Sequence, residues 1–173
     1  MAVNREELKS LQTPLKERYV AEPSTAVTRL HAVGTVDFDR IGCRVELPPN
    51  DGRMIHAGLH PMAGGDGTMA CSGDMLLQAL VSCAGTTLAA VATAMELPIR
   101  SASITAEGYM DFRGTLGVDR AVPVGFTMIE LRFTLDTAAS DEQIAKLLQL
   151  TERYCVVART LMAGVALTSV RTS

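Results

Sequence analysis

The feature that most constrains the fold is an uncharged stretch of 21 residues, from Met75 to Met95. It follows a glycine-bearing loop, in which Ser72 or Asp74 is placed to cap the start of a helix. Pro98 cannot continue a helix, so we expect one long helix that ends near Leu97. The stretch has the length of a membrane span, but polar and small residues interrupt it, namely Gln78, Ser82, Cys83, Gly85, Thr86, Thr87 and Thr93. This pattern favours the central helix of a soluble core.

Alternating apolar residues predict β-strands on both sides of this helix. Before it, residues 28–47 are predicted to form a β-hairpin and residues 54–59 a short third strand. After it, two long strands are expected over residues 100–112 and 126–135. A last short strand is expected over Val165–Val170.

A second long helix is predicted to begin after Ser140, because Gln143 follows at the spacing of a capping box. Its apolar face is expected to run on through Cys155, since five residues recur at steps of three and four: Ile144, Leu148, Thr151, Cys155 and Ala158. The resulting order, ββ(β)-α-ββ-α-β, indicates the α+β class and not a doubly wound parallel sheet.

The length of 173 residues suits one domain. We expect this domain over residues 28–173 and a charged N-terminal arm over residues 1–27. Pro14 is expected to restrict the arm to one or two helical turns.

The charge pattern argues against a nucleic-acid partner. The net charge is −3 and aromatic residues make up 4% of the chain, so there is neither a basic stripe nor an aromatic platform for bases. The first nine residues are polar and do not resemble a secretory signal. We therefore expect a cytoplasmic protein without a membrane partner, in which cysteines are free, catalytic, redox-sensing or metal-binding.

Cys83 and Cys155 are the best candidates for chemistry among the four cysteines. Either could simply fill space in a core, as buried free cysteines often do. However, small and hydroxyl residues surround Cys83 where a core helix would more often carry Leu or Ile. Arg153 and Arg159 flank Cys155 within two turns, and their charge would favour a thiolate over a thiol.

The remaining cysteines and histidines give weaker signals. Cys71 lies in the glycine-bearing loop and is either a loop residue that covers the core or a further thiol near the site. His56 and His60 could join it around a metal ion, but their spacing is not typical of zinc ligands, and we expect no metal. Cys43 alternates with apolar neighbours and is predicted to be a core residue.

Two segments resemble the OsmC/Ohr family, the osmotically induced and organic-hydroperoxide-resistance proteins. Residues 74–83 (DMLLQALVSC) resemble the first cysteine helix of that family, and residues 152–161 (ERYCVVARTL) resemble the second. The resemblance implies antiparallel sheets that wrap two central helices in an interlocked homodimer. It also implies that Cys83 attacks an organic hydroperoxide and becomes a sulfenic acid, that Cys155 resolves it as a disulfide, and that a dithiol reductant reopens the disulfide. No metal or organic cofactor is implied.

The sequence departs from the family pattern in the loop before the first motif. The family's peroxidases typically pair a loop arginine with a glutamate at the start of the first helix. Asp74 stands at the place of the glutamate, the loop from Leu59 to Gly73 contains no arginine, and His60 lies nearest its expected place. The second motif carries Val156 where the family usually has proline.

Three functions remain open at this point. The first is a thiol-dependent hydroperoxide reductase that uses Cys83 and Cys155, with Asp74, and possible support from His60, Arg159 and Cys71. The second is a non-catalytic protein on the same fold that binds a small hydrophobic ligand, or senses redox state, through structural or sensory cysteines. The third is a cysteine hydrolase that pairs Cys83 with His60.

Overall fold

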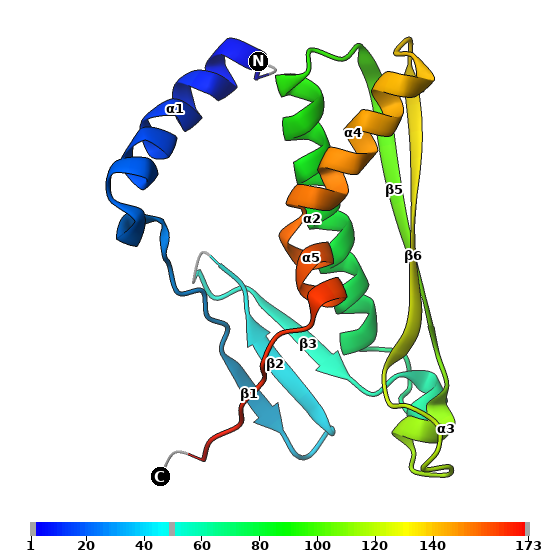
Figure 1. Ribbon diagram of the computed structural model, residues 1–173. Coiled ribbons are helices and arrows are strands. Elements are labelled where there is room, and N and C mark those ends of the chain that lie inside the picture. Colours follow the sequence, from blue (N-terminus) through cyan, green and yellow to red (C-terminus); the bar gives the residue numbers. More distant parts are fainter. Residues whose placement is uncertain (1–2, 49–50, 172–173) are drawn as a thin grey trace. The chain divides into compact units, whose positions relative to one another are not determined.

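The computed structural model describes residues 3–48 and 51–171 (Figure 1). These residues form two compact units, which are described separately below. Unit 1 comprises residues 3–16, 79–105 and 132–171, and unit 2 comprises residues 17–78 and 106–131. Helix α2 (Ser72–Ala94) and the strands β5 (Ile99–Met110) and β6 (Phe126–Thr137) contribute to both.

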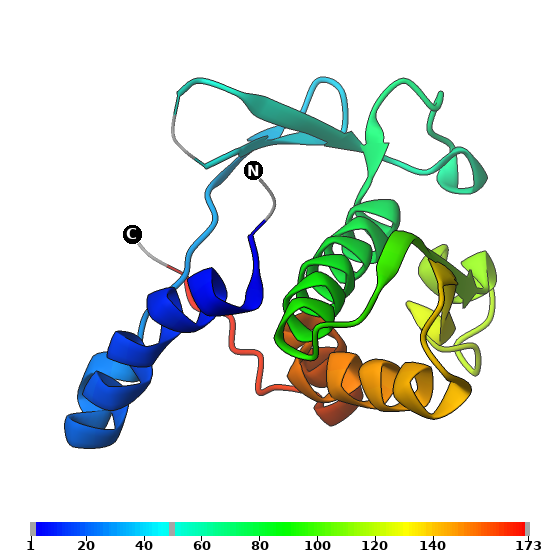
Figure 2. The same cartoon turned by 90° about the horizontal axis from the view of Figure 1, so that it is seen from above.

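The core of unit 1 lies on one stripe of α2. Its buried residues recur every four positions, at Leu80, Ala84, Leu88 and Ala92, so they lie on one side of the helix. Leu88 and Ala92 pack with Leu147 of α4 (Asp141–Tyr154), and partly buried residues of the strands surround them, including Ile104, Phe133 and Leu135. In the view from above, α4 and the following α5 (Val156–Ala163) lie beside α2 (Figure 2).

Strands β5 and β6 form a two-stranded sheet. Thr127 at the start of β6 donates a hydrogen bond to the carbonyl of Tyr109 near the end of β5, whereas Thr137 donates to the carbonyl of Pro98 just before β5. These bonds define an antiparallel pair, as predicted. A short helix, α3 (Phe112–Thr115), lies in the connection between the strands.

Unit 2 contains a sheet with the strand order β1-β2-β3-β4. Strands β1 (Gly34–Asp37), β2 (Gly42–Glu46) and β3 (Met54–Gly58) pair antiparallel, and the two-residue strand β4 (Ala70–Cys71) pairs parallel with β3. Strand β4 runs directly into α2. The predicted hairpin and third strand are therefore confirmed, although the first strand begins at Gly34 and not at residue 28.

Helix α2 was predicted nearly in full. It begins at Ser72 and ends at Ala94, three residues before Leu97. Among residues 3–48 and 51–171, α2 is the one helix long and apolar enough to cross a membrane, and a core helix of a soluble domain meets the same criteria. The capping box at Ser140 and Gln143 is also present, with hydrogen bonds in both directions.

The predictions for both ends of the chain were wrong. Helix α1 (Arg5–Ala21) continues past Pro14 for a total of 17 residues, because proline removes one backbone hydrogen bond and the remaining turns keep theirs. The strand predicted over Val165–Val170 is absent from the described residues, and the side chains of Val165, Leu167 and Val170 are 70–91% exposed. The apolar residues suit a strand, but a strand forms only where a neighbour accepts its backbone hydrogen bonds.

A candidate thiol site at the start of helix α5

The predicted second helix is two helices, and Cys155 is the residue that separates them. Its backbone angles, φ −69° and ψ 107°, are extended and not helical. Its N–H donates to the carbonyl of Thr151 at 2.9 Å and ends α4, while its sulfur accepts from the N–H of Ala158 at 3.5 Å and caps α5. The continuous helix was a wrong prediction, because the apolar spacing persists across the break while the backbone does not.

The break leaves the first turn of α5 with free backbone donors, since the first N–H groups of a helix have no partner within it. The N–H of Ala158 is bonded to the sulfur of Cys155. The N–H groups of Val157 and Val156 help to lower the pKa of Cys83, which comes from α2. The sulfur that accepts a hydrogen bond at the start of α5 is that of Cys155.

The two thiols differ in their access to solvent. Cys155 is 1% exposed, whereas Cys83 is only half-buried. Both are free cysteines, and each thiol affects the pKa of the other. A small reagent that enters from solvent would reach Cys83 first.

The surroundings move the pKa values of the two thiols in opposite directions. Burial raises the pKa of Cys83, but hydrogen bonds from the Val157 N–H, the Cys155 thiol, the Val156 N–H and the Thr87 hydroxyl outweigh it and bring that pKa below its ordinary value. Burial is also the largest influence on Cys155 and raises its pKa. The hydrogen bond to Cys83 and the charge of Cys83 raise the pKa of Cys155 further, and the Ala158 N–H offsets them only in part. As the pH rises, Cys83 loses its proton first and Cys155 keeps its own.

The hydroxyl of Thr87 acts on two groups of Cys83, its carbonyl oxygen and its sulfur. It lies one turn after Cys83 on α2, and its hydroxyl donates to the carbonyl of Cys83 at 2.8 Å. The same hydroxyl also lowers the pKa of Cys83. A hydroxyl has one proton to donate, so its help to the sulfur competes with its bond to the carbonyl.

The predicted site residues belong to two different units. Cys83, Cys155 and Arg159 belong to unit 1, and the side chain of Arg159 is exposed. Asp74 is an exposed residue of the first turn of α2, in unit 2. Cys71 lies half-buried in β4 of the same unit.

His60 is engaged within unit 2. Its Nδ1 accepts a hydrogen bond from the N–H of Met62 at 3.1 Å, and its ring stacks on Phe112 with the ring centroids 4.9 Å apart. These contacts suit a structural role and give no support to a hydrolase that pairs His60 with Cys83. Within the described ranges, no three His, Cys, Asp or Glu side chains are grouped so that they could hold a metal ion.

Sequence reasoning missed the backbone donors of Val156 and Val157. A weak signal was present, because two β-branched residues in succession lower helix propensity directly after Cys155. It missed the role of Thr87 as well, although a hydroxyl residue four positions after a helical cysteine is placed to bond its carbonyl.

Comparison with known proteins agrees with this architecture. Residues 65–170 match the family model of the OsmC-like proteins, and the chain belongs to that family. No curated protein matches the chain. Among solved structures, an OsmC-like protein from Mycoplasma pneumoniae is similar, with a TM-score of 0.63 and 17% identity over 79% of this chain and 89% of that one.

Two further solved structures have names that refer to organic hydroperoxides. An organic hydroperoxide resistance protein from Elizabethkingia anophelis has a TM-score of 0.62 and 14% identity over 80% of this chain and 91% of its own. One from Legionella pneumophila has a TM-score of 0.60 and 14% identity over 78% of this chain and 91% of its own. At these identities the likeness shows the shared α+β fold.

Proposed function

We propose that this protein reduces organic hydroperoxides with Cys83 as the attacking thiolate and Cys155 as the resolving thiol. The observation that carries the proposal is that the half-buried Cys83 and the buried Cys155 of unit 1 act on each other's pKa, with that of Cys83 lowered and that of Cys155 raised. Membership of the OsmC-like family and the names of the similar structures support a role in peroxide chemistry.

The reaction begins with the Cys83 thiolate, because the thiolate and not the thiol is the nucleophile. It attacks the terminal oxygen of the hydroperoxide, the O–O bond breaks, and the alkoxide leaves as an alcohol after it takes a proton. Cys83 is then a sulfenic acid. The sulfur of Cys155, once deprotonated, attacks the sulfur of Cys83, the S–O bond breaks, and hydroxide leaves as water after protonation. One hydroperoxide is thus reduced to one alcohol and one water, while two thiols become one disulfide.

An external dithiol closes the cycle by exchange with the disulfide. Asp74, His60, Arg159 and Cys71 stay as proposed supporting residues, whose contribution a panel of single substitutions would measure.

The direct test mixes the reduced protein with an organic hydroperoxide and maps the thiols that are lost. We expect two of the four free thiols to disappear per hydroperoxide consumed, and peptide mapping to find Cys83 joined to Cys155. A disulfide that contains Cys43 or Cys71, or the loss of no thiol at all, would refute the proposal.

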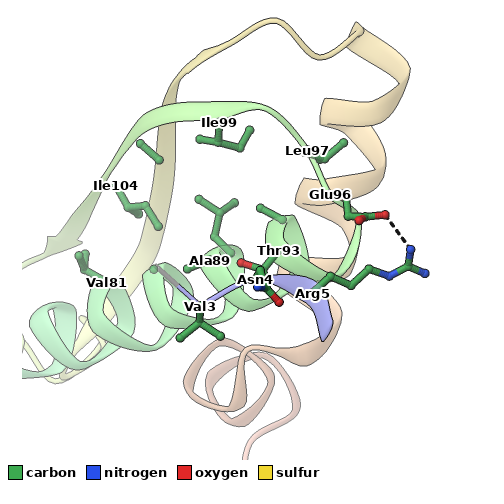
Figure 3. A pocket seen from close by; sticks show the side chains of 14 residues that line it. Val3, Asn4, Arg5, Val81, Ala89, Thr93, Glu96, Leu97, Ile99 and Ile104 are labelled. Carbon is green, nitrogen blue, oxygen red and sulfur yellow. Dashed lines mark hydrogen bonds and ion pairs between the residues drawn. The ribbon is translucent and has the colours of Figure 1, made fainter. Parts of the chain in front are cut away.

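A second candidate function rests on a cavity in unit 1. This cavity of about 730 Å³ has the volume of a small-molecule site, and residues of α2, β5 and the chain before and at the start of α1 line it (Figure 3). Apolar side chains such as Val81, Leu88 and Ile104 predominate, and an ion pair of 2.7 Å between Arg5 and Glu96 lies among the lining residues. These features suit a small hydrophobic ligand.

Native mass spectrometry of the freshly purified protein tests this alternative. A retained hydrophobic molecule that Leu88→Gln releases, together with thiols that do not react with hydroperoxide, would favour binding over catalysis. Ala94→Gln, at an exposed helix position outside the cavity lining, is the matched control and should leave the retained mass unchanged.

We also propose that the protein acts as a homodimer in the cytoplasm. Large apolar side chains are strongly exposed at both ends of the chain, with Leu30 at 89% and Leu167 at 91%, and such surfaces mark interaction sites. Light scattering should give twice the chain mass of 18.4 kDa. A monomer at micromolar concentration would contradict this assembly.

A further inference from the structure

We propose that the cavity of unit 1 binds an amphiphile with an apolar chain and a carboxylate head, and that Arg5 binds the head at the mouth of the cavity. The choice of this ligand class rests on the second candidate function, because the site is the same cavity. It is independent of the reduction of hydroperoxides by Cys83.

The cavity lies on a different side of α2 from the Cys83 thiol. Val81, Gly85 and Ala89 of α2 line it and recur at steps of four, so they share one side of the helix. Cys83 stands two residues from both Val81 and Gly85, which places it about half a turn around the helix from each. A ligand in the cavity is therefore held away from the thiol.

Gly85 leaves space in the cavity that a side chain would fill. It lies in the interior of α2, where glycine destabilises a helix relative to alanine. Among the described residues, a Cβ built there would meet one atom beyond its own helix backbone within 4 Å, the Cδ1 of Ile104 at 3.8 Å. That is an ordinary van der Waals distance, so close packing does not require glycine. The missing side chain suits a wall against which a ligand lies.

Arg5 carries hydrogen-bond donors that its ion pair does not use. Its Nη1 donates to Oε2 of Glu96 at 2.7 Å, and the side chain makes no further hydrogen bond to the described part of the chain. Arg100, in contrast, donates to Asp136 from both Nε and Nη2. A guanidinium has five N–H donors in a planar fork that matches a carboxylate. The Nε–Nη2 edge of Arg5 is thus free to bind a second carboxylate.

The charged pair lies at one side of a largely apolar lining (Figure 3). The side chains of Arg5 and Glu96 are 57% and 64% exposed, so a head bound there stays in contact with water. Apolar residues of α2 and β5 line the rest, among them Leu88 and Ile99. Small-molecule sites combine apolar walls with a few placed polar groups, and the ligand that matches both regions is an amphiphile.

A carboxylate fits this mouth better than an ammonium group does. An ammonium would compete with Arg5 for the carboxylate of Glu96, and the nearby guanidinium would repel it. A carboxylate also meets a like charge at Glu96, but two parallel hydrogen bonds from the free edge of Arg5 offset that repulsion. Arg5 therefore selects the head, and Glu96 orients Arg5.

Isothermal titration of the full chain with octanoate, octylamine and 1-octanol tests this ligand class, because the three probes share the apolar chain and differ in the head. We expect octanoate to bind most tightly. Arg5→Gln should weaken octanoate binding about tenfold, since hydrogen bonds to a charged group are lost, and should leave 1-octanol binding unchanged. Arg18→Gln removes another exposed arginine of α1 outside the cavity lining and is the matched control that should bind octanoate as the wild type does.

Two further measurements locate the bound probe. Gly85→Leu should abolish octanoate binding because the added side chain fills the cavity, whereas alkylation of Cys83 should leave it unchanged because the thiol lies on another side of α2. The opposite result in either measurement would overturn the site.

The outcomes also separate this inference from the proposed functions. Tightest binding of octylamine, or equal octanoate binding by the wild type and Arg5→Gln, would overturn the anionic class while the second candidate function stands. Failure of all three probes to bind, with a smaller mass of Gly85→Leu in light scattering, would overturn the site and show that the cavity is filled by a second copy of the chain. A protein that binds octanoate through Arg5 and does not reduce hydroperoxide would refute the peroxidase function alone.

Discussion

The chain carries two pairs of cysteines, and their surroundings differ in kind. Cys83 and Cys155 act on each other's pKa, and the sulfur of Cys155 accepts a hydrogen bond at the start of α5. Cys43 and Cys71 lie on strands of the same sheet, where Cys43 is level with Ala57 and Ala70. Cys71 is one residue further on, so the two side chains point to opposite faces of the sheet.

The direction of the hydrogen bonds separates the pairs further. The sulfur of Cys155 accepts a bond from the backbone N–H of Ala158, whereas the thiol of Cys43 donates toward the carbonyl of Arg44 at 4.0 Å. Four free cysteines in one chain are therefore not equivalent, and the backbone around each decides which can act.

The largest expected effect comes from Cys83→Ser. We expect the rate of hydroperoxide reduction to fall on the order of a thousandfold, because a hydroxyl without an activating base cannot replace the thiolate. Stopped-flow consumption of cumene hydroperoxide measures it. Cys43→Ser is the control from the other pair and should keep the wild-type rate, and equal losses in both variants would contradict the distinction between the pairs.

Cys155→Ser should separate the first turnover from the following ones. Serine cannot form the disulfide, so one equivalent of hydroperoxide should be consumed, a sulfenic acid should persist on Cys83, and turnover should stop. Trapping with dimedone followed by mass spectrometry detects the sulfenic acid. Continued turnover at the wild-type rate would show that another thiol resolves the sulfenic acid. Adding Cys43→Ser to the Cys155→Ser variant would then stop turnover if that thiol is Cys43.

The outcome for the helix that carries Cys155 shows how far sequence patterns reach. Uncharged length and Pro98 predicted α2, and the Ser140 capping box predicted the start of α4, since both signals are local. The break at Cys155 comes with a sulfur that accepts the N–H of Ala158 and caps α5. Such a cap leaves the apolar spacing unchanged, so Cys155 was predicted as a site residue while the break was not.

The strand predicted near the C-terminus failed for a related reason. Its apolar residues suit a strand, but strand formation requires a neighbour, and the described chain offers none to residues 165–170. A local sequence pattern shows that a segment could form a strand and does not identify the strand with which it would pair.

The pH dependence of labelling should distinguish Cys83 from Cys155 within one molecule. The pKa of Cys83 is lowered and that of Cys155 is raised, so iodoacetamide should label Cys83 at lower pH and Cys155 only at higher pH. The burial of Cys155 slows its labelling at every pH, so the comparison concerns the midpoint of each profile and not its plateau. A midpoint for Cys155 below that of Cys83 would reverse the proposed roles.

The smallest expected effect comes from Thr87→Val. The hydroxyl of Thr87 helps to lower the pKa of Cys83, but its single proton is already donated to the carbonyl of Cys83. We therefore expect alkylation of Cys83 below its midpoint to slow by about two- to threefold, as a shared neutral hydrogen bond implies.

Thr87→Ser is the matched control, because it keeps the hydroxyl and removes the methyl group. It should react as the wild type does, and circular dichroism should show that both variants keep their helices. If Thr87→Val alkylated at the wild-type rate, the hydroxyl would serve only the carbonyl of Cys83, and the difference between the two cysteine pairs would not depend on this side chain of α2.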